Sequence, residues 1–298
     1  MSIRNFILNC FKFLGIFLLI CLGALIFNSL LINSYGYKVE ENKNVLILGD
    51  SHTEYAIDDT VFTNSINLSH SADSYFYSFL KIRKLKKENP QIDTLLLALS
   101  NHNLLVEYED KWLFNTAHIK SKFRIYTDLM DFSDFMFLLK SNPSAVIQGV
   151  IESPKYSIKL LFNSDLIERD LGKFHPSQRN SLKKDIEQFK NNKYQRTLDY
   201  SNIEIKYLFN IVNFCKENDI ELVFISTPVH QEYTMRKTKE FETLKKFYNS
   251  ELSEFKYLDF SEFYMPDKCF QDMDHLNALG AESFTKNLMK EIKAEFNP

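Results

Sequence analysis

Four short apolar runs alternate with longer amphipathic segments, and this alternation is the feature that most constrains the fold. The runs are predicted strands at residues 45–48, 92–99, 220–226 and 255–260. Helical periodicity is predicted for residues 74–88, 201–218 and 279–296. Strands that alternate with helices form βαβ units, whose strands lie parallel in one sheet. The sequence therefore predicts a three-layer α/β/α domain with a mostly parallel sheet.

The segment from residue 104 to 200 has a less regular pattern. Residues 128–140 and 181–191 are predicted to be helical, and Pro143 and Pro154 are expected to break the chain. Aromatic residues recur between them. We interpret 104–200 as an insertion packed over the edge of the sheet at which the strands end. Open α/β sheets bind their ligands at this edge. A lid and a partner-binding surface are both open interpretations of this insertion.

The N-terminus carries a long stretch without charge. Residues 13–37 contain no Asp, Glu, Lys or Arg, and a helix of about 20 apolar residues crosses a hydrocarbon core of roughly 30 Å. Arg4 and Lys12 precede this stretch and favour a cytoplasmic N-terminus. We predict a single-pass anchor in the cell (inner) membrane, with the globular domain periplasmic or extracellular. A cleaved signal peptide is the alternative, but the apolar run is long and no Ala-x-Ala-like site follows it.

The predicted organisation has three parts. Residues 1–33 form a cytoplasmic tip and the transmembrane anchor, residues 34–43 form a polar linker, and residues 44–298 form one α/β domain. The net charge of −3 gives no electrostatic reason to expect nucleic acid as a partner. The basic run 81–87 is interpreted as the solvated face of an amphipathic helix.

Cysteine and histidine spacing gives no sign of a metal centre. Neither Cys-x-x-Cys nor His-Glu-x-x-His occurs, so no metal and no cofactor are predicted. Cys215 and Cys269 lie in the predicted outer domain, where an oxidising compartment would allow a disulfide. Their spacing in the sequence leaves that pairing open.

Two polar clusters at opposite ends of the domain carry residues for nucleophilic chemistry. Gly49-Asp50-Ser51-His52 follows the first strand, and Asp272-Met273-Asp274-His275 lies near the C-terminus. A serine hydroxyl is a poor nucleophile until a neighbouring base takes its proton, and the base works best when a third group fixes its tautomer. The two clusters therefore predict acyl-transfer chemistry on Ser51.

These clusters resemble the first and last motif blocks of the SGNH/GDSL hydrolase superfamily. Gly49-Asp50-Ser51 is similar to the first block, and Asp272-x-x-His275 followed by Leu-Asn-x-x-Gly280 is similar to the last. The resemblance covers the predicted outer domain except residues 104–200, and it implies a flavodoxin-like fold. It also implies that Ser51 is the nucleophile, that His275 is the general base and then acid, and that Asp272 orients His275. Asp274 competes with Asp272 for that last role.

The resemblance further implies an oxyanion hole, for which this chain has altered residues. Residues 67–72 are similar to the second block, with Ala72 where glycine is usual. A backbone N–H serves equally well from alanine unless φ must be positive. The third block normally reads Gly-x-Asn-Asp, and here either Asn101 or Asn103 is expected to point inward, with Asn101 favoured.

Several other side chains are candidates for substrate binding. His52 replaces the leucine of the common first block, and a turn-stabilising role is its alternative. His230 follows the third predicted strand, whereas His102 is expected to be an ordinary surface or packing histidine. Trp112 with Tyr108 and Phe114 is expected to form either a sugar-stacking platform or part of a packed core.

Taken with the anchor, these motifs resemble the membrane-anchored cell-envelope branch of the superfamily, which contains O-acyltransferases and esterases. The expected function is transfer or hydrolysis of O-acyl groups, above all O-acetyl, on envelope or exported polysaccharide through a Ser51 acyl-enzyme. In such systems a multi-spanning membrane partner delivers the acyl group. Two alternatives stay open: simple carbohydrate ester hydrolysis by the same residues, and a non-catalytic assembly module with the same fold.

Overall fold

The computed structural model describes residues 2–177, 179–191 and 198–296. The chain divides into two compact units. One contains Met1–Tyr37 and Phe114–Asp170 and is helical, and the other contains Lys38–Leu113 and Leu171–Pro298 and holds the sheet. We call them the helical unit and the sheet unit.

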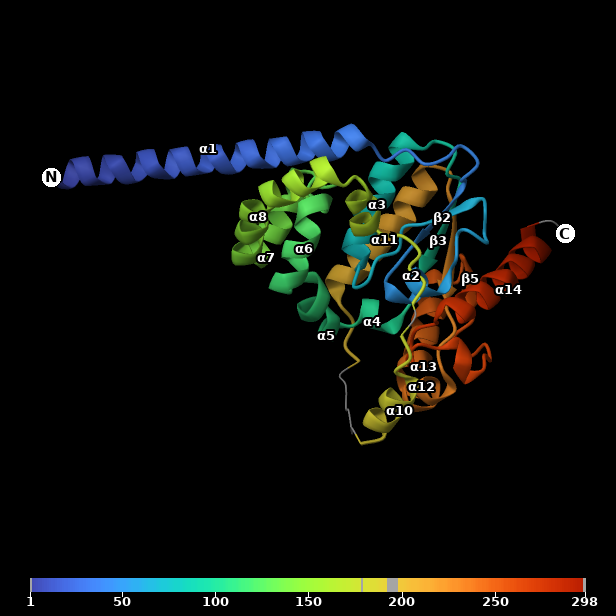
Figure 1. The fold of residues 1–298 in the computed structure, drawn as a ribbon. Helices are drawn as coiled ribbons and strands as arrows, with labels where there is room; N and C mark the ends of the chain where they lie inside the picture. The colour runs from blue at the N-terminus through green and yellow to red at the C-terminus, as the bar shows by residue number, and fades with distance from the viewer. Residues whose placement is uncertain (1, 178, 192–197, 297–298) are drawn as a thin grey trace. The chain divides into compact units, whose positions relative to one another are not determined.

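The sheet unit is built on five parallel strands in the order β2-β1-β3-β4-β5 (Figure 1). Their bounds are β1 Val45–Leu48, β2 Ser65–Asn67, β3 Thr94–Ala98, β4 Glu221–Ser226 and β5 Lys256–Asp259. Every neighbouring pair is parallel. This strand order is the flavodoxin-like one, so the predicted fold class is confirmed.

The predicted strands all form, and one further strand is present. β2 was not predicted because it is three residues long, with only Ile66 apolar between Ser65 and Asn67. It pairs with β1 in the register Val45 to Ser65. Such an edge strand depends on its neighbour and leaves almost no periodic pattern in the sequence.

Helices connect the strands of the sheet unit and cover its faces. Their bounds are α2 Ser51–Ala56, α3 Tyr75–Glu88, α4 Asn101–Leu104, α5 Val106–Tyr108, α10 Leu182–Asn191, α11 Asn202–Glu217, α12 Gln231–Arg236, α13 Thr238–Phe247 and α14 Ala278–Phe296, with short turns η1 Glu109–Leu113, η2 Tyr248–Leu252 and η3 Asp267–Cys269. α2 and α14 pack together, as do α3 and α11.

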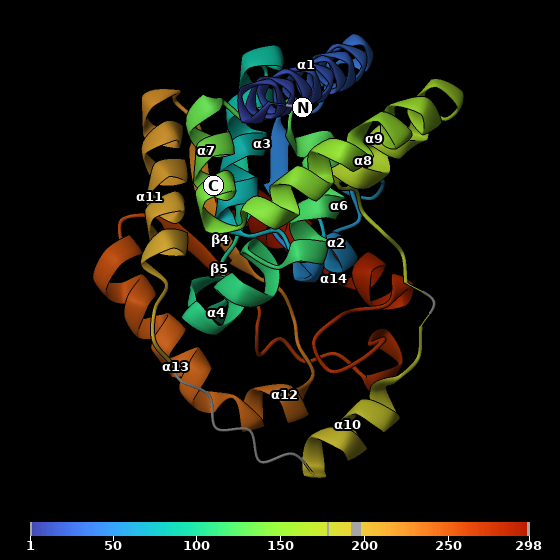
Figure 2. The same ribbon diagram turned by 90° about the vertical axis from the view of Figure 1, so that its left-hand side faces the viewer.

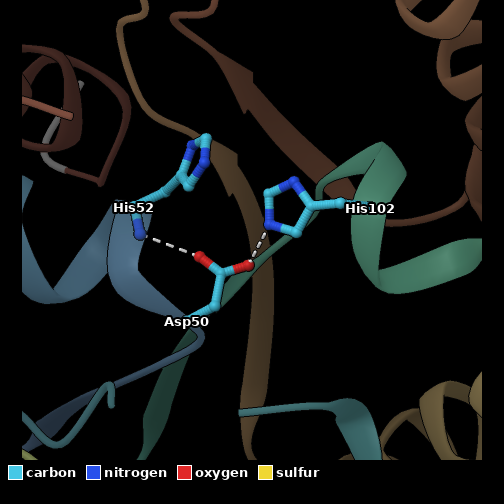
Figure 3. A group of neighbouring side chains, drawn as sticks. All are labelled: Asp50, His52 and His102. Atoms are coloured by element: carbon cyan, nitrogen blue, oxygen red, sulfur yellow. Dashed lines mark hydrogen bonds and ion pairs between the residues drawn. The ribbon is translucent and has the colours of Figure 1, made fainter. Parts of the chain in front are cut away.

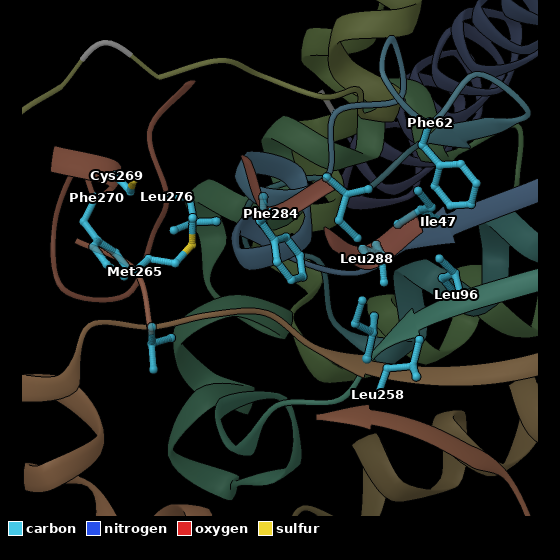
Figure 4. Packing of buried hydrophobic residues seen from close by; sticks show 14 of the residues in the cluster. Ile47, Phe62, Leu96, Leu258, Met265, Cys269, Phe270, Leu276, Phe284 and Leu288 are labelled. Atoms are coloured by element: carbon cyan, nitrogen blue, oxygen red, sulfur yellow. The ribbon is translucent and has the colours of Figure 1, made fainter. Parts of the chain in front are cut away.

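One face of the sheet packs against α14. Ile47, Leu96 and Leu258 of three strands lie in a buried cluster with Phe284 and Leu288 of α14 (Figure 4). Successive side chains of a strand point to opposite faces, and because the strands are apolar at nearly every position they are buried on both. This explains why their sequences read as continuous apolar runs.

Lys81, within the basic run on α3, does not lie on the solvated face that the sequence predicts. Its side chain is fully buried, and its ammonium group donates to the Leu68 carbonyl at 2.6 Å and to Asp73 Oδ2 at 2.5 Å. The prediction of a solvated basic face is therefore wrong at this position. Leu68 and Asp73 belong to the loop that follows β2, so the bonds from Lys81 connect this loop to α3.

The helical unit consists of α1 and the helices of the middle segment (Figure 2). Their bounds are α1 Ile3–Tyr35, α6 Thr116–Tyr126, α7 Phe132–Ser141, α8 Pro143–Phe162 and α9 Asp165–Leu171. α1 is long and apolar enough to cross a membrane. Most of its side chains are exposed, but Asn28 and Ile32 near its C-terminal end are buried.

Pro154 lies inside α8 and does not end it, so the predicted chain break there is wrong. Proline removes the hydrogen bond to the carbonyl four residues earlier, which here belongs to Val150. The Ser153 hydroxyl donates to that same carbonyl at 2.9 Å. This substitute bond allows the helix to continue through the proline.

The predicted insertion 104–200 is divided between the two units. Residues 114–170 join α1 in the helical unit, whereas residues 104–113 and 171–200 belong to the sheet unit. Residues 178 and 192–197 of the segment lie outside the described part of the chain. The middle segment is thus a partner for the N-terminal helix, a relation that sequence periodicity does not reveal.

Cys215 and Cys269 are both free and buried, so the structure forms no disulfide between them. Burial raises the pKa of the Cys215 thiol to about 12. Both residues therefore contribute to packing as small apolar groups.

Candidate active site

Ser51 lies at the carboxyl end of β1, as the first residue of α2. Asp50 is the N-cap of this helix, and its side chain accepts the His52 N–H at 2.9 Å. Gly49 allows the tight passage from strand to helix, since an added Cβ would lie 2.4 Å from Ala98 Cβ and 2.5 Å from Thr53 Oγ1. The turn therefore needs glycine before the aspartate.

The C-terminal cluster is brought to the same place. His275 Nε2 lies 2.7 Å from Ser51 Oγ. On the other side of the ring, His275 Nδ1 lies 3.0 and 3.1 Å from the two carboxylate oxygens of Asp272. The Asp272 carboxylate also accepts the backbone N–H of His275 at 2.8 Å. Ser51, His275 and Asp272 therefore have the connectivity of a nucleophile, a base and an orienting carboxylate.

Asp274 lies near the same imidazole but less closely. Its Oδ1 is 3.4 Å from His275 Nδ1, and its Oδ2 is 3.8 Å from His52 Nε2. Of the two competing carboxylates, Asp272 makes the shorter contacts with His275, whereas Asp274 lies between two histidines.

The loop that carries His275 is fixed by the residues that follow it. The Asn277 side chain donates to the carbonyls of Lys268 and Phe270 and accepts the Gly280 N–H. A Cβ on Gly280 would lie 2.1 Å from the Cys269 carbonyl oxygen. The Leu-Asn-x-x-Gly sequence thus packs the start of α14 against this loop.

The charges around His275 change its basicity. Burial of the ring would lower its pKa, but the hydrogen bond to Asp272 and the negative charges of Asp274 and Asp272 outweigh burial and raise the pKa of His275 to about 9. At neutral pH the ring is then mostly protonated. Proton abstraction from Ser51 needs the neutral ring, so the fraction of reactive protein depends strongly on pH.

A second carboxylate–histidine pair, Asp50 and His102, lies next to His52 (Figure 3). His102 Nε2 is 2.5 Å from Asp50 Oδ2, and the Asn103 side chain donates to the same oxygen at 2.9 Å. Burial alone would raise the pKa of Asp50, but the charge of His102 and its hydrogen bond hold that pKa well below its ordinary range. Asp50 is therefore a carboxylate at all ordinary pH values.

His52 lies between the two histidines. Its ring centroid is 4.6 Å from that of His102 and 5.0 Å from that of His275. Burial, together with the charge of His102, lowers the pKa of His52 to about 3 despite the nearby Asp50. A neutral His52 is thus a hydrogen-bonding group and not a cation at physiological pH.

Ser51 and the three histidines open onto one pocket of about 300 Å³. Trp112 and Tyr108 also line this pocket, with ring centroids 4.5 Å apart and planes inclined by 30°. The Lys111 ammonium lies 5.1 Å from the centre of the Trp112 ring. Tyr108 is buried and Trp112 is half-buried, and an aromatic side chain in a pocket wall is suited to packing against a sugar ring.

A smaller cavity of about 40 Å³ adjoins this pocket, with His52, His102 and Tyr108 lining both. Its other walls include apolar side chains from the strand ends, such as Leu99 and Val229. About 10–15 Å³ of such volume holds one water molecule, so this space suits a group of only a few heavy atoms.

The three predicted oxyanion residues lie in different surroundings. Asn103 is committed to Asp50, and Asn101 lines the smaller cavity, where its Oδ1 is buried without a hydrogen-bond partner among the described residues. Ala72 has a φ of 59°, which is the left-handed region that glycine adopts more easily. The lining of the Ser51 pocket includes none of these three within the described chain.

His230 has a structural position. Its Nδ1 accepts the Glu232 N–H at 3.2 Å as the N-cap of α12, and its Nε2 lies 3.3 Å from Asp267 Oδ1. Both ring nitrogens therefore have partners, and the described lining of the Ser51 pocket does not include His230.

The histidines and carboxylates are close enough to suggest metal ligands. One ligand atom from each of Asp50, His52 and His102 lies within 4.8 Å of the others, and the same holds for His52, Asp274 and His275. Atoms bound to one zinc ion at about 2.0–2.1 Å stand more than about 3 Å apart in a tetrahedron. The 2.5 Å contact between Asp50 Oδ2 and His102 Nε2 is a hydrogen-bond distance and is shorter than the spacing of two ligands on one zinc ion. The geometry of the first group is therefore that of a hydrogen-bonded pair and not that of a zinc site.

Sequence reasoning missed the position of His102. The sequence predicts an ordinary surface or packing histidine, but His102 follows β3 at the same sheet edge where Ser51 follows β1. Parallel strands bring their carboxyl ends together, and this rule points to any titratable side chain at such a position. The sequence leaves two interpretations of Trp112 open, and in the structure its side chain lines the Ser51 pocket.

Comparisons with known proteins add little to this geometry. An uncharacterised protein-family model matches residues 156–297, a stretch with Asp272 and His275 but without Ser51. This match covers less than half of the chain and describes no activity. No curated protein matches the chain. The fold and site therefore define only a class, an α/β protein with a Ser-His-Asp arrangement at the carboxyl edge of a parallel sheet.

Proposed function

We propose that the protein is a membrane-anchored serine acyltransferase or esterase. Its substrates are O-acyl groups, principally O-acetyl, on cell-envelope or exported polysaccharide. The observation that carries the proposal is the 2.7 Å contact between Ser51 Oγ and His275 Nε2, with Asp272 on the far nitrogen of the ring. This is the family branch that the motifs resemble.

The reaction follows from these contacts. Neutral His275 takes the Ser51 proton as Oγ attacks the carbonyl carbon of the acyl donor. The tetrahedral intermediate collapses, His275 gives the proton to the leaving oxygen, and the acyl group remains on Ser51. A sugar hydroxyl or water then attacks the acyl-enzyme, with His275 again as the base. Asp272 stabilises the imidazolium that forms in each half-reaction.

The pocket walls support a short acyl group and a sugar. The 40 Å³ cavity beside His52 and His102 has room for a group of acetyl size. The tilted ring pair of Trp112 and Tyr108 offers aromatic surface at the pocket wall. A Ser51 acyl-enzyme would lie between these two features.

The anchor supports transfer over simple hydrolysis. A diffusible ester needs no tethered enzyme, whereas a nascent polymer or a membrane-bound acyl donor does. We propose that α1 crosses the cell membrane once, with the N-terminus in the cytoplasm and the sheet unit outside, and that a multi-spanning partner supplies the acyl group. Hydrolysis is the second candidate, because water can enter the same open pocket.

A serine-directed fluorophosphonate probe tests the nucleophile. It should label the full-length protein in detergent, and the Ser51→Ala and His275→Ala variants should remain unlabelled. Labelling that persists in Ser51→Ala would disprove the assignment. Release of p-nitrophenol from p-nitrophenyl acetate then separates the two activities, because transfer predicts stimulation by a glycan acceptor and hydrolysis predicts none.

A further inference from the structure

Helix α8 of the helical unit has a buried apolar face and, next to it, an exposed apolar face. Its inner face is buried, with Val146, Val150 and Leu160 among its residues. Its outer face exposes five large apolar side chains: Ile147 (48%), Ile151 (53%), Ile158 (56%), Leu161 (55%) and Phe162 (86%). A helix on the surface of a soluble domain carries polar residues on its outer side, so this pattern is typical of a helix with two apolar surroundings.

The five outer residues form one stripe. Relative to Ile147 they lie 4, 11, 14 and 15 positions along the helix, and at about 100° per residue these positions fall within roughly 100° of the helix circumference. We call this set the α8 stripe. It is a continuous apolar surface and not a scatter of single exposed residues.

The α8 stripe adjoins the apolar N-terminal helix, because the C-terminal part of α1 packs on α8. The contact is fixed by hydrogen bonds: Asn28 Nδ2 donates to the Arg124 carbonyl at 2.7 Å, Ser157 Oγ donates to Asn28 Oδ1 at 2.7 Å, and Tyr35 OH donates to the Leu160 carbonyl at 3.0 Å. Asn28 and Ser157 are fully buried. The end of α1 is therefore part of the core of this unit.

Both helices expose apolar side chains near their contact. α8 packs on the C-terminal part of α1 and runs across it, since Figure 2 views α1 nearly end-on and α8 from the side. In that part of α1, Ile26, Phe27 and Leu30 stay exposed while Asn28 and Ile32 face the unit. Both helices thus expose apolar side chains in the region where they pack together.

We infer that the α8 stripe lies in the lipid bilayer interface beside α1 and contacts acyl chains of the same membrane. The occupant is lipid, because α8 packs on a helix whose own exposed surface is that of a membrane span. Lys155 and Lys159 lie on α8 close to the stripe, where long cationic side chains reach anionic headgroups. The inference rests on the proposed anchoring of α1 and is independent of the chemistry at Ser51.

This arrangement has a consequence for the N-terminal helix. Removal of α1 as a signal peptide would uncover the buried side of α8 and leave Ser157 without Asn28. The helical unit therefore requires α1 to remain attached. The anchor is then the first helix of a membrane-seated unit and not a loose tether.

Lipid quenching of site-specific fluorophores tests the inference. The full-length protein, with Cys10 and Cys21 replaced by serine and the buried Cys215 and Cys269 by alanine, is placed in nanodiscs of phosphatidylethanolamine and phosphatidylglycerol. A fluorophore is attached to single cysteines at Ile151 or Ile158. Leu19 in α1 is the positive control and the exposed Lys239 in the sheet unit is the negative control.

Brominated lipids should quench the label at Ile151 and Ile158 at least fivefold more than at Lys239. Quenching there equal to that at Lys239, with Leu19 strongly quenched, would overturn the inference while leaving the anchor in place. Absence of quenching at Leu19 would instead disprove the anchoring on which the inference rests. Labels at the stripe that neither lipid nor aqueous quenchers reach would show a protein partner on this face and would also overturn it.

Discussion

The pH dependence of Ser51 reactivity is a direct test of the site. Asp272 and Asp274 raise the pKa of His275 to about 9, against about 6.5 for a free imidazole. Only neutral His275 can take the serine proton. With a pKa of 9, roughly 1% of the rings are neutral at pH 7 and about half are neutral at pH 9.

The rate of fluorophosphonate labelling should therefore rise roughly 50-fold from pH 7 to pH 9 and level off above it. An unperturbed histidine would give a rise of less than about twofold over the same range. The assay measures labelling of full-length protein in detergent by in-gel fluorescence at several pH values. Ser51→Ala supplies the background at each pH.

Two matched variants separate the carboxylates. Asp272→Asn removes the closer partner of His275, at 3.0 Å, and should move the midpoint of the profile to lower pH and lower its plateau. Asp274→Asn removes a charge 3.4 Å away and should move the midpoint less, with a smaller loss of plateau rate. A wild-type midpoint at or below 6.5, or one that Asp272→Asn leaves in place, would refute this account of the base.

Four further predictions concern single side chains. Lys81→Met should cost about 3–5 kcal/mol in chemical denaturation, because it leaves the fully buried Asp73 without its cation; unchanged stability would contradict this. Ala72→Gly should stabilise the protein by up to about 1 kcal/mol, since φ is 59° there, whereas Ala72→Val should destabilise it. Burial raises the pKa of Glu204 to about 8. The stabilising contribution of neutral Glu204 is therefore complete below about pH 4.5, and the free energy of unfolding should fall by about 1.4 kcal/mol per pH unit from there to pH 8. Glu204→Gln should abolish that slope when unfolding by denaturant is measured at several pH values. Trp112→Ala should reduce glycan-stimulated transfer about tenfold and leave fluorophosphonate labelling nearly unchanged; an equal loss of both would place Trp112 in the structure of the site and not in sugar binding.

Much of the fold was accessible from local pattern because the central strands are buried on both faces. β1, β3 and β4 appear in the sequence as apolar runs, and the long helices α3, α11 and α14 show clear periodicity. β2 has neither property, since a three-residue edge strand owes its existence to pairing with β1. Its detection needs the neighbouring strand.

The site was accessible in part for a related reason. Ser51 and His275 stand in motifs where each local sequence fixes its own turn, through Gly49 at the first and Asn277 with Gly280 at the second. Their mutual distance of 2.7 Å could only follow from the sheet. The pairing of Asp50 with His102 has no local signature, because the two residues follow different strands.

By itself the sequence determined the parallel α/β core, the apolar N-terminal helix and the residues able to act as nucleophile, base and orienting carboxylate. Those properties depend on short-range periodicity and on turns of a few residues. Tertiary structure alone decided that Lys81 is buried, that His52 lies between His102 and His275, and that α1 joins α8 in one unit. Each of these depends on which distant surfaces meet, and burial and pKa values are set by those meetings.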